Sequence, residues 1–263
     1  MNSMNFVGEL KPVLSVVFAD SDPTASRIAA ARQVFGFLPE VELHRLVRAA
    51  EVRSFRHKQV ILRDGDPGVS LIVVLEGFVK LSTVDQDGRE TLLDIVGPGD
   101  CIGELAILND WQHSADATAL SPCRVLSIDV RQFRQMLERN PACLLEIVRM
   151  VGDRLHRTTE RLVDALGLPA PAHLAKAILR LADLRHQNGN GQTAPKLRQS
   201  ELAAMTGLCR ESVNKLLAAW SEAGWIQMVG GSVELAEPSA LRRLIGEGQF
   251  MPGRMPERAS AAR

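Results

Sequence analysis

The stretch CIGELAILNDWQHSADATALS, residues 101–121, has the residue types of a site for an anionic ligand. It joins a Gly-Glu-Leu turn, a polar loop and a run of small residues, which let backbone amides come close to a phosphate group. The stretch contains no lysine or arginine, although a buried phosphate needs a cation with several hydrogen-bond donors. The sequence therefore predicts the form of a phosphate site without its usual cation.

A second stretch, QSELAAMTGLCRESVNKLLAAWSEAGWI at residues 199–226, has residues suited to reading DNA. Two short helical patterns flank a turn at residues 206–208, and small residues before the turn let the helices cross closely, which predicts a helix-turn-helix. The following GWIQMVGGSVELAEP predicts a two-stranded wing with a Gly-Gly tip. An ordinary helical hairpin with solvated charges is the competing interpretation. The outward side chains that begin the second helix are Arg210, Glu211, Ser212, Asn214 and Lys215.

These side chains match the hydrogen-bonding edges of bases in the major groove. Arginine can make two hydrogen bonds to guanine, glutamate can accept from the cytosine amine, and lysine can reach guanine or a phosphate. Cys209 stands directly before them. A thiol beside Arg210 at a helix N-terminus can have a lowered pKa, which makes Cys209 a candidate redox-sensitive residue. A small residue tolerated at this position is the simpler interpretation.

The elements around these two stretches change character along the chain. Residues 52–128 read as short strands separated by Gly, Pro and Asp turns, which predicts an antiparallel sandwich or barrel.

Residues 130–166 read as helix with a break at Asn140–Pro141. After the break, apolar residues recur at spacings of four and three, which predicts pairing with a second copy of the same helix. Packing on its own domain is the alternative. The predicted dimer seam comprises Leu144, Val148, Val151, Leu155 and Leu162, with Thr158 and Ala165 at its remaining positions.

Length and composition agree with a two-domain globular protein. The chain has 263 residues, 46% hydrophobic and 24% charged, and no run of 18 apolar residues, so we expect no membrane association. Residues 1–130 carry a net charge of −6 and residues 168–245 a net of +3, which suggests different partners for the two parts. The four cysteines form no CxxC pair, and the N-terminus lacks the pattern of a secretion signal, so we expect a cytoplasmic protein.

The predicted organisation is an N-terminal extension (1–33), a β domain (34–130), a dimerisation helix (131–167), a winged helix-turn-helix (168–245) and a disordered tail (246–263).

The stretch CRESVNKLL followed by GWI resembles the recognition helix of the bacterial cyclic AMP receptor protein and FNR superfamily. The resemblance covers about residues 34–245 and includes GPGD at 97–100 and IGEL at 102–105. It implies an α+β fold with a cyclic-nucleotide-binding-type β-roll (a double-stranded jelly roll), a long dimerisation helix and a C-terminal winged helix-turn-helix. It also implies a homodimeric transcription regulator that binds double-stranded DNA and works with RNA polymerase. A module of this type that does not bind DNA is the competing class. An enzyme is disfavoured because the sequence has no P-loop, GxSxG or HExxH motif.

On this resemblance, the helix-turn-helix residues take specific roles. Arg210, Glu211 and Lys215 fall on base-reading positions, and Ser212 falls where a phosphate contact is common. At position 215, lysine replaces the arginine of the best-known members. Its ammonium group still donates hydrogen bonds, but it lacks the planar guanidinium group that makes two parallel hydrogen bonds to one base. The implied half-site is close to TGTGA within a palindrome, with two recognition helices about one DNA turn apart.

The same resemblance assigns residues 101–121 to an effector pocket. Gly103 and Glu104 match the family cassette, in which the glutamate accepts a ribose hydroxyl, and Ser114 and Ala115 match its end. His113 stands where an arginine pairs with the cyclic phosphate, and the loop is about one residue shorter. Protonated histidine can replace this arginine only partly at neutral pH, since its ordinary pKa is about 6.5.

Further along the chain, Thr158 and Thr159 correspond to a Thr-Ser pair that meets the adenine. A role of Thr158 in setting the register of the seam is equally open.

Three interpretations of the sensor remain open. The pocket could bind cyclic AMP or cyclic GMP in an altered pose, with His113 and Ser114 at the phosphate. It could bind another small molecule or none, in which case DNA binding would be controlled by the amount of protein or by Cys209. The missing cation favours this second interpretation. It could hold haem, although no spacing selects a pair of ligands. An iron–sulfur cluster is disfavoured because no cysteine precedes Cys101. The haem candidates are His44, His57, His113 and Cys101.

Overall fold

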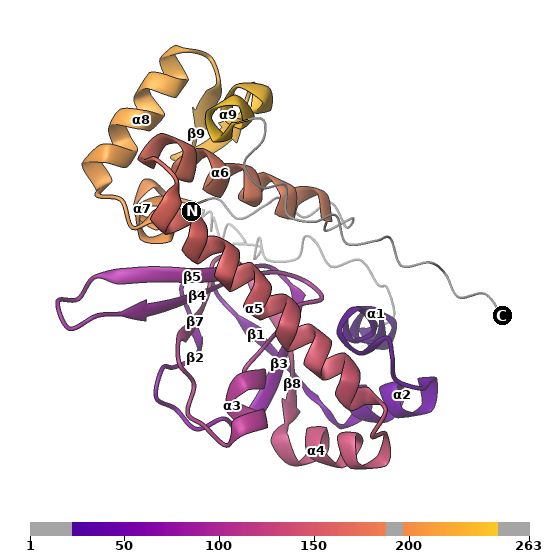
Figure 1. The fold of residues 1–263 in the computed structure, drawn as a ribbon. Helices are drawn as coiled ribbons and strands as arrows, with labels where there is room; N and C mark the ends of the chain where they lie inside the picture. The colour runs from indigo at the N-terminus through magenta and orange to yellow at the C-terminus, as the bar shows by residue number, and fades with distance from the viewer. Residues whose placement is uncertain (1–22, 188–196, 247–263) are drawn as a thin grey trace, which may run out of the picture.

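The computed structural model describes residues 23–187 and 197–246, which form an N-terminal domain, a connecting helix and a C-terminal domain (Figure 1). The predicted disordered tail lies outside these residues except for its first position. In the N-terminal domain the elements are α1 (Pro23–Phe35), α2 (Glu40–Ala49), β1 (Glu51–Phe55), β2 (Val60–Leu62), β3 (Ser70–Glu76), β4 (Val79–Val84), β5 (Glu90–Val96), β6 (Cys101–Ile102), α3 (Glu104–Asn109), β7 (Asp116–Ala119), β8 (Cys123–Asp129) and α4 (Val130–Arg139). The rest comprises α5 (Cys143–Gly167), α6 (Ala170–Gln187), α7 (Gln199–Thr206), α8 (Arg210–Glu222), β9 (Ile226–Val229), β10 (Ser232–Leu235) and α9 (Pro238–Ile245).

Two four-stranded antiparallel sheets form the body of the N-terminal domain. Their strand orders are β1-β8-β3-β6 and β2-β7-β4-β5. Strand β3 is buried on both faces, because its alternate side chains point in opposite directions. Ile72 and Val74 belong to the core between the sheets, whereas Leu71 and Val73 belong to a second core under the helices. The antiparallel sandwich predicted from the short strands is confirmed, as is the β-roll that the resemblance implies.

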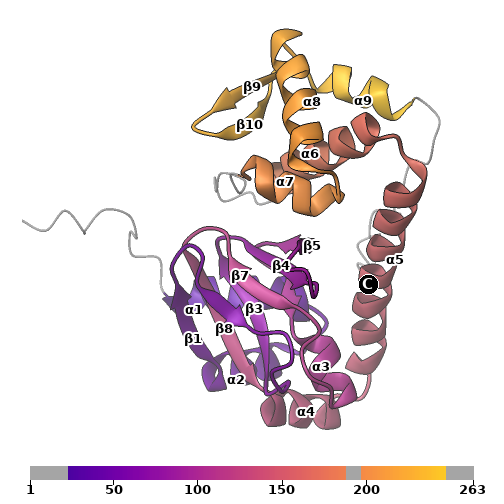
Figure 2. The ribbon, with the colours of Figure 1, turned by 90° about the vertical axis from the view of Figure 1, so that its left-hand side faces the viewer.

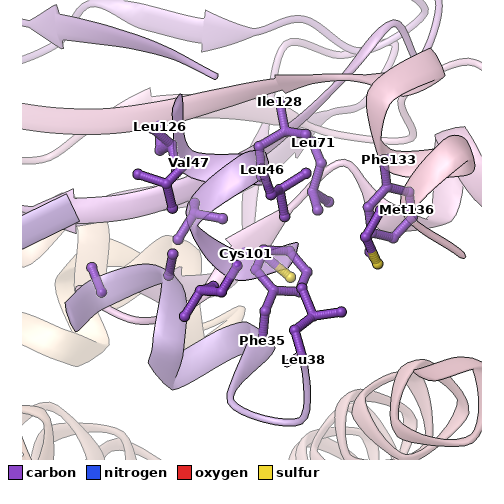
Figure 3. Close-up of a cluster of buried hydrophobic side chains, with 14 of the residues drawn as sticks. Phe35, Leu38, Leu46, Val47, Leu71, Cys101, Leu126, Ile128, Phe133 and Met136 are labelled. Atoms are coloured by element: carbon purple, nitrogen blue, oxygen red, sulfur yellow. The ribbon is translucent and has the colours of Figure 1, made fainter. Parts of the chain in front are cut away.

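Helices α1, α2 and α4 cover the outer face of the sheet that contains β3. Figure 3 shows their apolar side chains, among them Phe35, Leu46 and Phe133, packed against Leu71 and Leu126 of the sheet. The boundary expected at residues 33–34 falls inside α1, whose last turn contributes Phe35 to this core. The end of the expected N-terminal extension is therefore part of the domain, because Ala30 and Ala31 are buried in the same core.

The predicted break at Asn140–Pro141 separates α4 from α5. Asp129 begins α4, since its side chain accepts a hydrogen bond from the backbone amide of Arg131 at 2.8 Å. Helix α5 is 25 residues long, which gives it a length of about 37 Å. It runs along the outside of the N-terminal domain up to the C-terminal domain (Figure 2). Buried Cys143 and Ile147 attach its first turns to the N-terminal core.

The C-terminal domain is a helix-turn-helix with a two-stranded wing, as the sequence predicts. Gly207 adopts a left-handed φ of 67°, which permits the sharp turn between α7 and α8. Leu202 and Val213 from these two helices pack with Leu174 of α6 and Trp220 in one core. The same core includes Ile95 of β5, so the C-terminal domain is docked on the N-terminal domain through the contact of α7 with β5. Across the described ranges, no helix is both long and apolar enough to span a bilayer.

Candidate functional site

The first turns of α8 carry an exposed polar face, here called the reading face, made of Arg210, Glu211, Asn214 and Lys215. These four side chains are exposed because Val213, Leu217 and Trp220 occupy the opposite, buried side of the helix. Ser212 is half-buried. Helix α8 lies in the C-terminal domain, and its first turns follow directly on α7 (Figures 1 and 2). The reading face is exposed to solvent in the single chain.

The thiol of Cys209 lies at the N-terminal end of α8, beside the reading face. Its Sγ is 3.0 Å from Ser212 Oγ, and hydrogen bonds from the side chain and backbone of Ser212 lower the pKa of the Cys209 thiol. The other three cysteines, Cys101, Cys123 and Cys143, are buried. Cys209 is thus the chemically accessible thiol of the chain.

The predicted wing follows α8 as the antiparallel pair β9–β10, with Gly230 and Gly231 between the strands. Both glycines have positive φ, which suits the primed turns of tight hairpins. The wing itself has no lysine or arginine. Arg242 and Arg243 follow later in the chain, in the last turn of α9.

The predicted dimer seam is an exposed apolar strip on α5. Leu144, Val148, Leu155 and Leu162 are all more than half exposed, and Leu155 is 66% exposed. Val151 is half-buried. Leu145, Val163 and Leu166 extend the strip beyond the positions predicted from the heptad pattern. An apolar strip of this size along a helix is characteristic of a surface that another protein chain covers.

Three of the predicted pocket residues, Gly103, Glu104 and His113, lie at or beside the start of α3. Gly103 begins this helix with φ of +90°, and a side chain there would come within 3.0 Å of the Ser70 carbonyl oxygen and 3.3 Å of the His113 ring. Glu104 follows and is only 2% exposed. Its Oε1 accepts a hydrogen bond from Arg154 Nη1 of α5 at 2.6 Å. Its Oε2 is buried with no hydrogen-bond partner among the described residues.

Arg154 is the site residue that the sequence reasoning missed. It lies one helical turn before Thr158, and Thr158 Oγ1 donates a hydrogen bond to the Arg154 carbonyl at 2.9 Å. A spacing of four residues puts the two side chains on one face of α5. The signal was therefore present in the sequence as an arginine one helical turn from a predicted pocket residue.

We expect Arg154→Met to destabilise the N-terminal domain by about 3 kcal/mol, because it leaves the Glu104 carboxylate buried without its counter-ion. The double variant Arg154→Met/Glu104→Gln removes both charges and should recover most of this loss. Arg149→Met is the matched control, since Arg149 pairs with Glu146 at the surface of the same helix and such a pair contributes less than about 1 kcal/mol. Urea unfolding followed by circular dichroism measures the free energies. Equal losses for Arg154→Met and Arg149→Met would contradict this account.

The environment of His113 favours the neutral form of its imidazole. The residue is 7% exposed, and its backbone amide and carbonyl are bonded to Asp66 and Gly65 at 2.8 Å each. Burial lowers the pKa of the His113 imidazole, although the nearby Asp66 and Glu104 carboxylates oppose the effect. A histidine whose pKa lies below its ordinary value of about 6.5 is mostly neutral at pH 7.

The remaining predicted pocket residues are only partly brought together. Ala115 is half-buried, and Ser114, Thr158 and Thr159 are exposed. The hydroxyls of both threonines donate to backbone carbonyls one turn earlier, at 2.9 Å. They remain able to accept a hydrogen bond from a ligand, because a hydroxyl has two lone pairs.

The four haem candidates lie in different environments. Cys101 is buried, its Sγ lies 3.4 Å from Met150 Sδ, and burial raises the pKa of its thiol. His57 Nδ1 lies 2.8 Å from the Leu120 carbonyl oxygen, and His44 is on α2 near Glu40. No group of three His, Cys, Asp or Glu side chains suited to a metal ion occurs among the described residues.

Comparison with known proteins agrees with this architecture. Residues 52–140 match the cyclic nucleotide-binding domain model, and residues 172–244 match the Crp-like helix-turn-helix domain model. A CRP-like cAMP-activated global transcriptional regulator of Mycobacterium tuberculosis is 31% identical over 218 residues, which is 82% of this chain and 97% of the relative. A CRP/FNR-family transcriptional regulator of Thermus thermophilus superposes with a TM-score of 0.62 at 27% identity, covering 74% of this chain and 98% of the other. The c-di-GMP-responsive global regulator CLP of Xanthomonas campestris, at 20% identity, shares the fold with a TM-score of 0.64 over 75% of this chain and 99% of the other.

Proposed function

Because the chain belongs to the CRP/FNR superfamily of transcription regulators, we propose that it acts as a homodimer that binds a TGTGA-like palindrome through α8. The family is one of regulators and not of enzymes, and this chain has both its cyclic nucleotide-binding domain and its helix-turn-helix. The observation that carries the proposal is the exposed reading face, with Arg210, Glu211 and Lys215 in the first turns of the helix that directly precedes the wing. Arginine and glutamate at these positions can read guanine and cytosine directly.

The exposed apolar strip on α5 supports the dimer. A parallel pair of these helices would cover Leu144, Val148, Leu155 and Leu162 and place two reading faces on one side of the molecule. A twofold protein then requires a palindromic site with its half-sites about one helical turn apart. RNA polymerase and a cytoplasmic location belong to the same proposal, since a regulator must meet both its promoter and the enzyme that transcribes it.

For the effector, we propose that cyclic AMP and cyclic GMP do not control DNA binding at neutral pH. The neutral, buried His113 gives no charge to a cyclic phosphate. A charge-assisted hydrogen bond of this kind is worth about 2 kcal/mol, or roughly thirtyfold in affinity. Regulation then comes from another small molecule, from the amount of protein or from oxidation of Cys209.

A cyclic-nucleotide-responsive regulator is the second candidate, and Glu104 is the observation that favours it. Its unpartnered buried Oε2 can accept a hydroxyl hydrogen bond of the kind a ribose offers. The relative described above as cAMP-activated supports the same interpretation. In that case nucleotide affinity should rise as the pH falls below about 6.5, since protonation of His113 supplies the missing charge.

The affinity of the purified, reduced protein for a TGTGA palindrome, measured with and without each nucleotide at fixed salt, tests both candidates. We expect tight binding that neither nucleotide changes. His113→Arg should restore nucleotide binding by about thirtyfold in calorimetry, whereas the neutral control His113→Gln should not. A large gain in DNA affinity when cyclic AMP is added to the parent protein would overturn the effector proposal. Absence of DNA binding under every condition would favour a module that does not bind DNA.

A further inference from the structure

Asp164, in the last turn of α5, is a buried carboxylate held by two cations from the next helix. Its side chain is 7% exposed. Lys176 Nζ lies 2.5 Å from its Oδ1, and Arg180 Nη2 lies 2.7 Å from its Oδ2 as an ion pair without hydrogen-bond geometry. The two cations are four residues apart on α6 and therefore share one face of that helix. Three charges from two helices thus meet at one largely buried point.

The covalent link between these helices does not by itself fix their angle. Helix α5 ends at Gly167 and α6 begins at Ala170, so only Leu168 and Pro169 lie between them. Gly167 is exposed, and no atom lies within 4 Å of where a Cβ would stand. Glycine also has the widest choice of backbone torsions. Rotation at this residue would swing α6 and everything packed on it.

A cavity lies between the two domains, next to the C-terminal half of α5. It has a volume of about 290 Å³ and lies between β5, α5, α6 and α7. Its lining includes Asp94, Arg161, Arg180 and Met205. Arg161, one turn before Asp164, bonds Asp94 Oδ1 at 2.5 Å and the Leu93 carbonyl at 2.8 Å. The last two turns of α5 therefore hold the N-terminal domain through Arg161 and the C-terminal domain through Asp164.

We infer that Asp164 is a positioning residue for DNA binding. Its pairs with Lys176 and Arg180 set the direction in which α6 leaves α5. Because Leu174 of α6 shares a core with Val213 of α8, the same pairs set the position of the reading face. The role in DNA binding rests on the proposed function, but the effect on domain orientation does not.

Distance measurement between two nitroxide labels tests the inference without DNA. One label is placed on Cys209, which is exposed while the other three cysteines are buried. The second is placed on Arg131→Cys, whose native side chain is 84% exposed on α4 of the N-terminal domain. Dilution with an excess of unlabelled protein leaves one labelled protomer in each dimer, so the distance reported is always within one chain. Double electron–electron resonance then gives the distribution of domain orientations.

The parent should give one narrow distance distribution, and Asp164→Asn should widen it roughly twofold or shift its mean. Asp164→Glu keeps the charge and should restore most of the narrow distribution. Asp153→Asn, at an exposed carboxylate of the same helix, is the matched control and should match the parent. If Asp164→Asn fails to fold, Lys176→Met removes one partner and should widen the distribution to a smaller degree. Distributions that superpose on the parent for the folded variants would overturn the inference.

A second measurement is how the affinity for DNA depends on the spacing of the two half-sites. A loss of stability alone would not change this dependence. The parent should lose about tenfold in affinity when the palindrome is lengthened by one central base pair. Asp164→Asn should lose clearly less, since its reading faces are less fixed. If the parent does not bind the palindrome at all, the proposed DNA site fails, while the label distances still decide the role of Asp164. Equal spacing preference in a variant with a widened distribution would refute the link from orientation to DNA binding.

Discussion

Replacing Leu155 with glutamate is expected to convert the protein from a dimer into a monomer. Leu155 is 66% exposed at the middle of the apolar strip on α5. Each of the two copies would lose about 2 kcal/mol of apolar burial, and together this weakens the dimer by on the order of a thousandfold. Two carboxylates facing each other across the seam add repulsion. Sedimentation equilibrium at micromolar concentration measures the change.

The matched control for this prediction is Leu155→Met, which keeps an apolar side chain of similar volume and should remain a dimer. The monomer should also lose most of its affinity for the palindrome, because only one reading face can then engage at a time. A Leu155→Glu protein that sediments as a dimer would show that the strip is covered by something other than a second α5.

Arg210→Ala is expected to remove most of the sequence-specific binding to DNA. A bidentate arginine–guanine pair is worth about 1–3 kcal/mol, and the dimer makes two of them, so the loss is about 4 kcal/mol or roughly a thousandfold. Binding to a scrambled duplex should change only slightly, because non-specific affinity depends on the total number of phosphate contacts. Fluorescence anisotropy with both duplexes at one salt concentration gives the two affinities.

Two further variants sharpen this experiment. Arg210→Lys keeps the charge but loses the planar fork, so we expect it to retain non-specific binding and lose specificity. Arg131→Ala removes another exposed arginine, from the N-terminal domain, and should leave both affinities unchanged. If Arg210→Ala weakens both duplexes by the same factor, Arg210 contacts the backbone and the base-reading role is wrong.

Helix α5 connects the predicted effector pocket with both domains. Glu104, at the pocket, is bonded to Arg154 of α5, and two and three turns later the same helix presents Arg161 and Asp164 to the two domains. A ligand that changed the partner of Glu104 would act on this helix directly. The nucleotide titration decides whether cyclic AMP or cyclic GMP is such a ligand, and the label distances decide whether the end of α5 sets the domain orientation.

The sequence alone predicted those elements whose sequence signals lie within a few neighbouring residues. The β domain followed from turns of Gly, Pro and Asp, and the helix break followed from Asn140–Pro141. The helix-turn-helix followed from periodicity around Gly207, and the structure has all three. Each of these signals acts within a few residues, since torsional preference and side-chain period are properties of the chain itself. The missing cation of the loop at residues 101–121 was also evident from residue types.

Only the tertiary structure decided which charges meet. Glu104 and Arg154 are 50 residues apart, and their pairing depends on how α5 is rotated against α3. The same holds for Asp164 with its two cations, and for the docking of the C-terminal domain on β5. The state of His113 also required the fold, because the pKa of a histidine depends on its burial and its neighbours. Sequence spacing places residues on a face of one element, but the packing of separate elements determines what that face contacts.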